Sequence, residues 1–310
     1  MIYTLTLNPA IDKTVEIKGL ALGGVNRTDS ERTDVGGKGI NVSKVIKTLG
    51  GKSVAMGIIG GSTGDIIESY MTELGISVDF VRVSEPTRTN LKIIDTENHV
   101  NTDINGQGSR VSADTISQIE QKLGGALKPG DITVLAGSVP KGAPADIYAR
   151  LIRLCNSHEA YTVLDVDGAL LREGLLAKPY LIKPNIDELS RITCKTISTV
   201  RETAGVAMEI VRGGIPNVVV SLGGDGALFC MKDGAYHARG LKVPVRSTVG
   251  AGDSMVAALC VSLERGYDIG QTISLAVAAS AANVTCSGTQ PAQYSLIEQL
   301  IPQVSWERII

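Results

Sequence analysis

The most informative stretch of this chain is Thr248-Val249-Gly250-Ala251-Gly252-Asp253-Ser254-Met255. Glycines and small residues lead here into an apolar run, 255–261, that is typical of a helix. Such a turn presents free backbone N–H groups and the positive end of a helix dipole, so it can bind an anion. Asp253 stands beside this anion site as a proton acceptor, which is what phosphoryl transfer to a hydroxyl requires. The alternative is a plain glycine-rich turn between a strand and a helix.

The composition excludes several classes of function. The 310 residues are 43% hydrophobic, enough for a large core, and the net charge of −2 gives no basic field for nucleic acid or an anionic membrane. The five cysteines form no Cys-x-x-Cys pair and only three histidines occur, so no zinc spacing is present. The N-terminus lacks the features of a signal peptide, and no apolar run reaches the ~18 residues that span a membrane. We therefore expect a cytoplasmic protein without a nucleic-acid or membrane partner.

Short apolar strands alternate with helical patterns along most of the chain, which indicates an α/β fold of three layers, a mostly parallel central sheet with helices on both faces. Strands are expected near residues 2–7, 53–59, 78–83, 132–135, 162–165, 180–182, 218–221, 227–231 and 235–238. Helices are expected near residues 39–49, 65–74, 112–123, 144–155, 187–193, 200–212, 252–264, 270–285 and 295–301. In such a sheet, ligands bind beyond the carboxyl ends of the strands.

Two segments do not fit the alternation. Residues near 12–35 and 88–104 are rich in strand and turn patterns, and they predict a small β-sheet at the side, a candidate lid. No linker, low-complexity tract or internal repeat divides the chain. We therefore expect residues 1–310 to form a single domain that carries these two lid segments.

Familiar phosphate-binding motifs fail on individual residues. The segment Gly51-Lys52-Ser53 is similar to the end of a Walker A loop, but Ile46 stands where that motif needs glycine. A dinucleotide fingerprint on Gly250-Ala251-Gly252 needs glycine at the position of Met255. No His-Arg-Asp or Asp-Phe-Gly set occurs, so a protein kinase is excluded too.

Two segments together identify a family: Gly36-Gly37-Lys38-Gly39-Ile40-Asn41-Val42 and Ser247-Thr248-Val249-Gly250-Ala251-Gly252-Asp253. They resemble the two signatures of the ribokinase-like sugar kinases, the phosphofructokinase-B group. Three further segments fit the same family in the same order, namely Asn8–Asp12, Lys183–Glu188 and Ser221–Gly226. The resemblance covers essentially the whole chain. It implies a ribokinase-like kinase fold, the cofactors ATP and Mg²⁺, and a sugar hydroxyl as acceptor.

The acceptor side of the site is expected to be cationic. A sugar phosphate must exchange its water shell for charge-assisted bonds, whereas a neutral sugar needs no cationic cluster. The resemblance places Arg27, Lys38 and Arg88 on the substrate phosphate, although each alone could be an ordinary solvated residue. The other residues that it implies around the sugar phosphate are Asp12, Gly36, Gly37, Asn41, Asn90 and Ser138.

The nucleotide side follows from the same resemblance. Asn185 and Glu188 would organise the water shell of Mg²⁺, although a helix cap and a capping-box pair would explain them as well. Asn283 matches a position near the adenine, but a buried asparagine can also serve the backbone. Asp253 would be the catalytic base. The remaining implied contacts, to nucleotide phosphates, the nucleotide and the transferring oxygens, are Lys183, Ser221, Gly223, Gly226, Thr248, Gly250, Ala251 and Gly252.

Two segments narrow the choice of acceptor. Thr87–Lys92 and Ser247–Val256 are similar to the matching segments of the family branch that acts on fructose 1-phosphate. The implied reaction is attack of the 6-hydroxyl on the γ-phosphate of ATP. Tagatose 6-phosphate and fructose 6-phosphate stay open as alternative substrates. A non-catalytic sugar-phosphate sensor would lack Asp253 or the glycines beside it, and all of these are present. The resemblance also implies a homodimer formed through the lid, since an exposed sheet edge favours pairing.

Overall fold

A ten-stranded sheet lies at the centre of the computed structural model, which describes residues 1–310. Its strands are β1 (Ile2–Thr6), β4 (Ser53–Gly60), β5 (Ser77–Val83), β8 (Ile132–Ala136), β9 (Tyr161–Asp165), β10 (Leu181–Ile182), β11 (Asn217–Ser221), β12 (Ala227–Met231), β13 (Gly234–Ala238) and β14 (Trp306–Arg308). They run in the order β14-β13-β12-β11-β10-β9-β8-β1-β4-β5. All pairs from β5 to β11 in this order are parallel, and β12 to β14 add antiparallel pairs.

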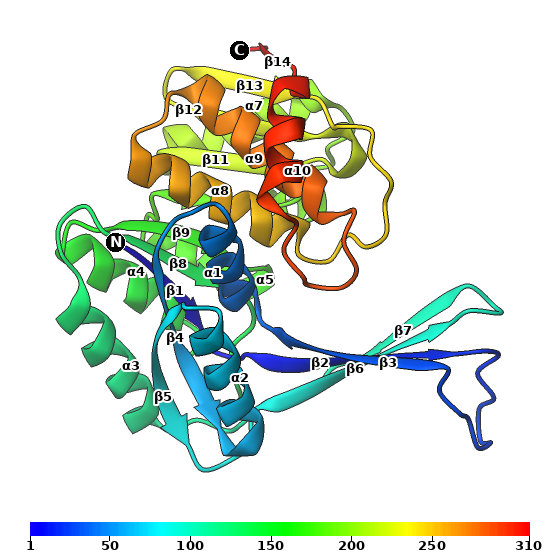
Figure 1. Ribbon diagram of the computed structural model, residues 1–310. Helices are drawn as coiled ribbons and strands as arrows, with labels where there is room; N and C mark the ends of the chain where they lie inside the picture. Colours follow the sequence, from blue (N-terminus) through cyan, green and yellow to red (C-terminus); the bar gives the residue numbers. More distant parts are fainter.

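Helices cover both faces of this sheet (Figure 1). One hydrophobic cluster joins the sheet to α3 (Ala113–Ala126), α4 (Ile147–Ser157), α5 (Gly168–Leu176), α6 (Ile186–Thr193) and α7 (Val200–Arg212). Two other clusters join it to α1 (Lys38–Thr48), α2 (Gly61–Glu73), α8 (Ala251–Arg265), α9 (Ile269–Asn283) and α10 (Tyr294–Leu300). The expected three-layer architecture is therefore confirmed. None of these helices is long and apolar enough to cross a membrane.

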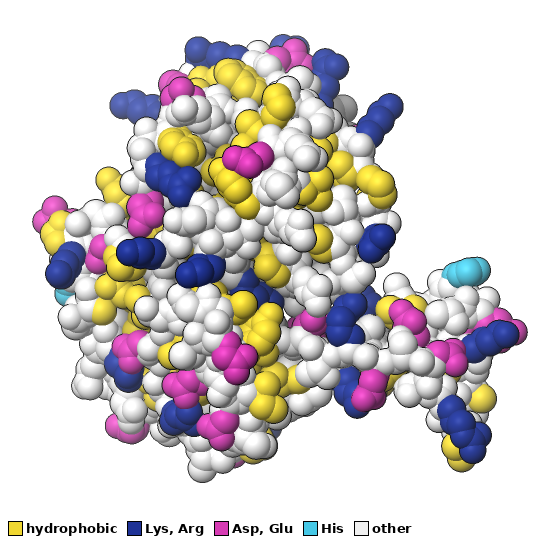
Figure 2. Space-filling view, in the orientation of Figure 1, with side chains coloured by type: hydrophobic (Ala, Val, Ile, Leu, Met, Phe, Trp, Pro, Cys, Tyr) yellow, Lys and Arg dark blue, Asp and Glu magenta, His cyan; other side chains and the backbone are white.

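A second sheet projects from this body as an arm (Figure 1). Its strands are β2 (Ala10–Ile17), β3 (Ser30–Gly36), β6 (Arg88–Asp95) and β7 (Val100–Ile104), in the order β3-β2-β6-β7. The pairing of β2 with β6 is parallel, and the outer pairs are antiparallel. Figure 2 shows that the arm stands clear of the body and carries both acidic and basic side chains. The small side sheet predicted from residues 12–35 and 88–104 is confirmed.

Local sequence explains where several helices begin. Three of them start with a capping box, in which the N-cap side chain and the third helical side chain each bond to the other's backbone N–H. These boxes are Asn185–Glu188 for α6, Thr199–Glu202 for α7 and Asp268–Gln271 for α9. Because each box satisfies two otherwise free N–H groups, it fixes the first turn of its helix.

Two elements were not predicted. Helix α5 contains Gly168 and Gly174, which weaken a helical pattern, yet a Cβ on Gly174 would lie only 2.5 Å from Leu164. That glycine therefore serves close packing of the helix on β9. Strand β14 has only three residues, all exposed, and it exists because it pairs with the edge strand β13. Neither feature leaves a periodic signal in the sequence.

The topology determines where a site can form. The chain adds β4 and β5 on one side of β1 and adds β8 to β11 on the other side. The strand order therefore reverses between β1 and β8, and open α/β sheets bind ligands at the carboxyl ends of the strands beside such a point. The turn that leads into α8 lies at the same edge, as the cleft described next shows.

Candidate active site

A cleft of about 960 Å³ lies between the arm and the carboxyl edge of the large sheet. Most of the site residues predicted from the sequence line it. They are Asp12, Gly37, Lys38, Asn41, Arg88, Asn90, Ser138, Lys183, Thr248, Gly250, Gly252 and Asp253. They come from β2, β6, α1, the ends of β8 and β10, and the start of α8. Segments far apart in the sequence thus meet in one cavity.

The turn before α8 forms one end of this cleft. Gly250 is the N-cap of α8 and has the left-handed φ of 84°, a conformation that favours glycine. The amide of Ala251 donates to the carbonyl of Thr248 at 3.4 Å, whereas the amides of Gly252 and Asp253, in the same first turn of α8, have no intrahelical partner. A Cβ on Gly252 would lie 3.0 Å from the ammonium of Lys183. Free amides, a helix dipole and a lysine therefore converge at one point, as an anion site requires.

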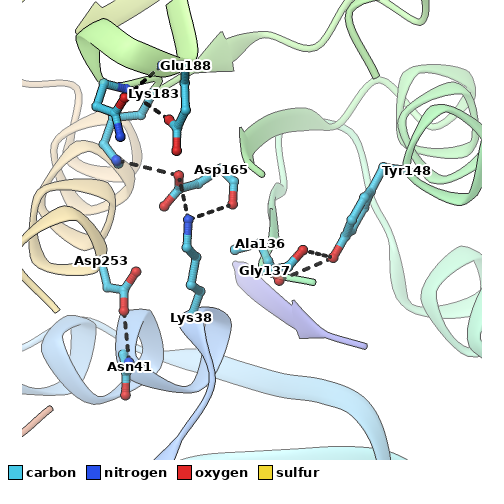
Figure 3. Close-up of polar contacts among 10 residues, drawn as sticks. Lys38, Asn41, Ala136, Gly137, Tyr148, Asp165, Lys183, Glu188 and Asp253 are labelled. Carbon is cyan, nitrogen blue, oxygen red and sulfur yellow. Dashed lines mark hydrogen bonds and ion pairs between the residues drawn. The ribbon is translucent and has the colours of Figure 1, made fainter. Parts of the chain in front are cut away.

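Asp253 lies in the first turn of α8 and is only 6% exposed. Asn41 donates a hydrogen bond of 2.8 Å from Nδ2 to its Oδ2 atom (Figure 3). Burial and the negative charge of Asp165 raise the pKa of Asp253 to about 6, although Lys38, Asn41 and Lys183 oppose the shift. A carboxylate with a pKa near 6 is charged at neutral pH and is a better proton acceptor than an exposed aspartate.

An ion cluster lies next to Asp253 (Figure 3). Asp165 ends β9 and is 2% exposed, and its Oδ1 atom lies 3.2 Å from Lys38 Nζ and 3.5 Å from Lys183 Nζ. Burial alone would raise the pKa of Asp165, but Lys183 and Lys38 outweigh it, so the pKa is lowered. Burial lowers the pKa of Lys38, but the negative charges of Asp165 and Asp253 raise it by more, so the pKa rises to about 12. The cluster therefore keeps Lys38 charged at the cleft and holds Lys183 beside it.

Sequence reasoning missed Asp165. The signal was present, because an acid that ends an apolar strand reaches the edge where ligands bind. Its Oδ2 atom is buried and has no hydrogen-bond partner. A buried carboxylate oxygen without a partner is costly, so this atom is available to a ligand or an ion.

The arm side of the cleft is built around Asp12. Asn90 donates a 2.8 Å hydrogen bond to its Oδ1 atom. Gly36 is required opposite, because a Cβ there would lie 1.9 Å from Oδ2 of Asp12. Burial raises the pKa of Asp12 even though Asn90 and Arg88 oppose the rise. Gly37 has a φ of 120° and lies against Thr6, where a side chain would not fit.

Arg88 is engaged with the protein itself. Its Nη1 donates to the carbonyl of Gly106 at 3.0 Å, and its Nη2 donates to the carbonyl of Asn8 at 2.9 Å and to Ser138 Oγ at 3.4 Å. Nε donates to the carbonyl of Pro9. The guanidinium therefore ties the arm to the loops after β1 and β8. The Ser138 turn is held further by Tyr148, whose hydroxyl bonds to the carbonyls of Ala136 and Gly137 (Figure 3).

Arg27 does not join this cluster within one chain. It is exposed on the loop between β2 and β3, beyond the last paired residues Glu16 and Ser30, and it does not line the cleft. The loop forms the tip of the hairpin, at the end of the arm that is farthest from the body (Figure 1). The basic residues that line the cleft from the arm are instead Lys13, Arg32, Arg88 and Lys92. The strand register places Arg32, Arg88 and Lys92 on one face of the arm sheet, whereas Lys13 has the opposite parity on β2.

Several residues predicted for the nucleotide lie outside the lining of the cleft. Asn185 and Glu188 form the capping box of α6, which is the alternative to a magnesium role that the sequence left open for both residues. Ser221 forms a bridge to Asn185, and Gly223 and Gly226 belong to the tight turn after β11. These positions lie next to Lys183 along the carboxyl edge of the sheet, at the ends of β10 and β11.

Asn283 has a different environment. It is buried at the end of α9, and its Nδ2 donates to the carbonyl of Gln290 at 3.2 Å. Its Oδ1 has no hydrogen-bond partner and would lie 2.9 Å from a Cβ on Gly250. Asn283 therefore packs behind the anion-binding turn and bonds to backbone, which is the alternative open for this residue in the sequence.

Comparison with known proteins is consistent with this geometry. The model of the pfkB family of carbohydrate kinases matches residues 3–295. A 1-phosphofructokinase of Bacillus subtilis is 34% identical over 309 residues, which are 100% of both chains. A crystal structure of a putative phosphofructokinase from Staphylococcus aureus superposes with a TM-score of 0.88 at 33% identity, covering 100% of this chain and 99% of that one.

Two further solved structures bear on the fold. Phosphofructokinase-2 from Escherichia coli in complex with fructose-6-phosphate has a TM-score of 0.90 at 28% identity and covers 97% of this chain and 98% of its own. A ribokinase from Thermotoga maritima has a TM-score of 0.80 at 21% identity, covering 97% of this chain and 99% of that chain, which concerns the fold alone. The ribokinase-like fold expected from the motifs is confirmed.

Proposed function

The chain belongs to the pfkB family of carbohydrate kinases, and we propose that within this family it is a 1-phosphofructokinase that converts fructose 1-phosphate and ATP to fructose 1,6-bisphosphate and ADP. One observation carries the chemistry: the buried carboxylate of Asp253, with its pKa raised to about 6, in the first turn of α8, beside the lysines that pair with Asp165. The identity to 1-phosphofructokinases over the full length supports the choice of sugar.

Asp253 acts as the general base. The 6-hydroxyl oxygen forms a bond to the γ-phosphorus, while the bond from that phosphorus to the β–γ bridging oxygen breaks. ADP leaves with the bridging oxygen, and the hydroxyl proton passes to Asp253. The transition state of such a transfer is loose, so positioning and charge stabilisation contribute more than the strength of the base. Gly250, Ala251 and Gly252 place the amides of the turn around the transferring oxygens.

The charges of the cleft divide between the two substrates. Lys183, 3.0 Å from the Cβ position of Gly252, binds nucleotide phosphate at the turn. Lys38 and Arg88 bind the phosphate of the sugar, with Ser138 beside them. Asp12, which Asn90 holds in place, accepts hydrogen bonds from sugar hydroxyls. The side chain of Asn41 directs the carboxylate of Asp253 toward the acceptor.

The donor set suits Mg²⁺. Mg²⁺ is usually held by one or two carboxylates together with waters and substrate phosphates, so it needs no group of three or more protein ligands, and none arranged to hold a metal ion occurs here. The unpartnered Oδ2 of Asp165 supports a cation at this edge of the sheet. Glu188 uses Oε2 in the capping box, so its Oε1 would be left to bind a water of Mg²⁺, with Asn185 beside it. When bound, Mg²⁺ neutralises charge on the β- and γ-phosphates.

Fructose 6-phosphate is the second candidate substrate. The likeness to phosphofructokinase-2 from Escherichia coli, whose complex with fructose-6-phosphate covers 97% of this chain, favours it among the alternatives. Tagatose 6-phosphate needs the same base and the same phosphate contacts. ATP and a phosphorylated sugar are both solutes of the cytoplasm, so the proposed enzyme works there, as one kinase domain over residues 1–310.

The arm acts as a lid and as a dimer interface. Its outer strand β7 is exposed throughout, with Val100 53% and Ile104 54% exposed. An exposed edge with apolar side chains favours pairing with a second copy. Sedimentation equilibrium of the wild type and of Ile104→Glu tests this, with a dimer and a weakened dimer as the expected results. A wild-type monomer at all concentrations would contradict it.

The test of the chemistry is Asp253→Asn. An amide keeps the shape and the bond to Asn41 but cannot take the proton, so kcat falls by about 10²–10⁴-fold. Binding of ATP and of fructose 1-phosphate, measured by calorimetry, stays within about threefold, because the base acts on the transition state. Loss of binding with little change in the rate of the bound complex would overturn the assignment.

A further inference from the structure

Lys44 of α1 is a buried cation that the proposed reaction does not use. It is 3% exposed, and no carboxylate lies within ion-pair distance of its ammonium. Its Nζ instead donates to two backbone carbonyls, those of Val35 at 2.8 Å and of Thr289 at 3.1 Å. Burial lowers the pKa of Lys44 to about 8, with Asp34, Asp253 and Asp12 opposing the shift. A buried, unpaired ammonium is costly, so its position calls for a physical reason.

The two carbonyls belong to different parts of the molecule. Val35 lies near the end of β3, where the arm joins the body, and Thr289 lies in the loop 284–290 that follows α9. The same two segments touch a second time. A Cβ on Gly288 would lie 2.3 Å from Nη2 of Arg32 and 2.8 Å from Oδ2 of Asp34, so these arm side chains rest directly on the loop.

The loop 284–290 is also attached to the anion-binding turn. The amides of Arg246 and Ser247 donate to the carbonyl of Val284 at 2.8 and 3.2 Å. Asn283 donates to the carbonyl of Gln290 and packs its Oδ1 against Gly250. A continuous path of hydrogen bonds and packed atoms therefore runs from the arm, through Lys44 and this loop, to Gly250.

We propose that Lys44 is a positioning residue that couples the root of the arm to the anion-binding turn before α8. When β3 moves over the acceptor, the carbonyl of Val35 moves with it. Because the ammonium of Lys44 is bonded to this carbonyl and to that of Thr289, the movement also shifts Thr289 and the loop beside Gly250. Because coupling between two sites is reciprocal, a ligand under the arm strengthens binding of a nucleotide at the turn, and the reverse. This coupling between the two ligands rests on the proposed function, whereas the link between β3 and the loop 284–290 does not.

Hydrogen exchange of the ligand-free protein tests the link without any substrate. In Lys44→Met, the amides of 34–36 and of 286–290 exchange faster together, by about tenfold or more, as expected when bonds from a charged donor are lost. The rest of α1 keeps its protection. Lys47→Met is the matched control, because Lys47 lies on the same helix and donates to one exposed carbonyl, that of Gly75. Faster exchange on one side only, or across all of α1, would overturn the link.

Two further variants keep the test decisive. Lys44→Arg retains the cation and restores protection at both segments at least in part. Gly288→Ala leaves Lys44 intact but presses on Arg32 and Asp34, so it disturbs the same contact from the loop side. It produces the same two-sided increase if the segments are coupled. An increase confined to the loop would count against the proposal, even if Lys44→Met proves too unstable to study.

Ligand binding tests the coupling itself. The Kd of a non-hydrolysable ATP analogue is measured with and without saturating fructose 1-phosphate. We expect the sugar phosphate to strengthen binding at least about fivefold in the wild type and less than about twofold in Lys44→Met. An equal factor in both proteins, or no factor in the wild type, would overturn the coupling. If the wild type binds no sugar phosphate at all, the proposed function fails, and the exchange experiment still decides whether Lys44 links the two segments.

Discussion

The body and the arm contribute to the same cleft but are built in opposite ways. In the body, Asp165, Lys183 and Asp253 are almost fully buried and lie at the ends of strands or at the start of a helix that hydrophobic clusters hold in place. In the arm, most side chains stay half-exposed, and β7 is exposed along its whole length. The proposed chemistry therefore lies on the well-packed part, and the proposed contacts to the acceptor come partly from an element that has little core of its own.

The largest expected difference between the body and the arm is in how much a mutation lowers the free energy of unfolding. Ile46 is fully buried on α1, so Ile46→Ala costs about 2–5 kcal/mol of the free energy of unfolding. Leu22 is 92% exposed at the tip of the arm, and Leu22→Ala changes that free energy by less than about 0.5 kcal/mol. Urea denaturation measures both. A large loss in the tip variant would mean that the arm is packed against something in solution.

Asp253→Asn sharpens the comparison within the body. The pKa of Asp253 is raised to about 6, so the charged carboxylate lowers stability above that pH and has no such effect below about pH 4. A rise of this size corresponds to about 3 kcal/mol. The variant should therefore gain up to that amount at pH 8 and much less at pH 4.5, measured by urea denaturation. Asp225→Asn, at an exposed turn, is the control, and equal gains at both pH values would contradict the buried charge.

Arg88→Lys tests the junction of arm and body. A lysine cannot reproduce the forked bonds to the carbonyls of Gly106 and Asn8 and to Ser138. We expect kcat/KM for the sugar phosphate to fall about 10–100-fold, with a smaller change in KM for ATP, in steady-state assays. Arg110→Lys, at an exposed position without side-chain bonds, should change neither value. Equal losses toward both substrates would mean that Arg88 acts on the fold as a whole.

The pH profile examines the ion cluster. Because Asp253 must be ionised, kcat/KM should fall about tenfold per pH unit below a pKa near 6. The negative charge of Asp165 raises that pKa, so Asp165→Asn should move the acidic limb to lower pH. The substrate is the same in both assays, so its own phosphate titration cancels. If the acidic limb stays at the same pH in Asp165→Asn, Asp165 does not raise the pKa of Asp253.

The sequence was sufficient for much of the body and for less of the arm. The turn at Gly250 and Asp253 was predicted because its glycines, acid and apolar helix are all local. Asp165 was missed because its importance depends on two lysines that are distant in the chain. Arg27 was expected on the substrate phosphate, but the length of β2 and β3 decides where the loop between them lies. Lys44 has no motif, and only the meeting of Val35 with Thr289 reveals it.

The most direct test of the central claim is kcat/KM for three acceptors, measured as ATP-dependent release of ADP with Mg²⁺. We predict that fructose 1-phosphate is preferred over fructose 6-phosphate and tagatose 6-phosphate by at least about 10²-fold, or about 2.7 kcal/mol of transition-state discrimination. A preference for one of the other two sugars would keep the base and contradict the assigned substrate. No turnover with any of them would contradict the catalytic role of the Asp253 turn.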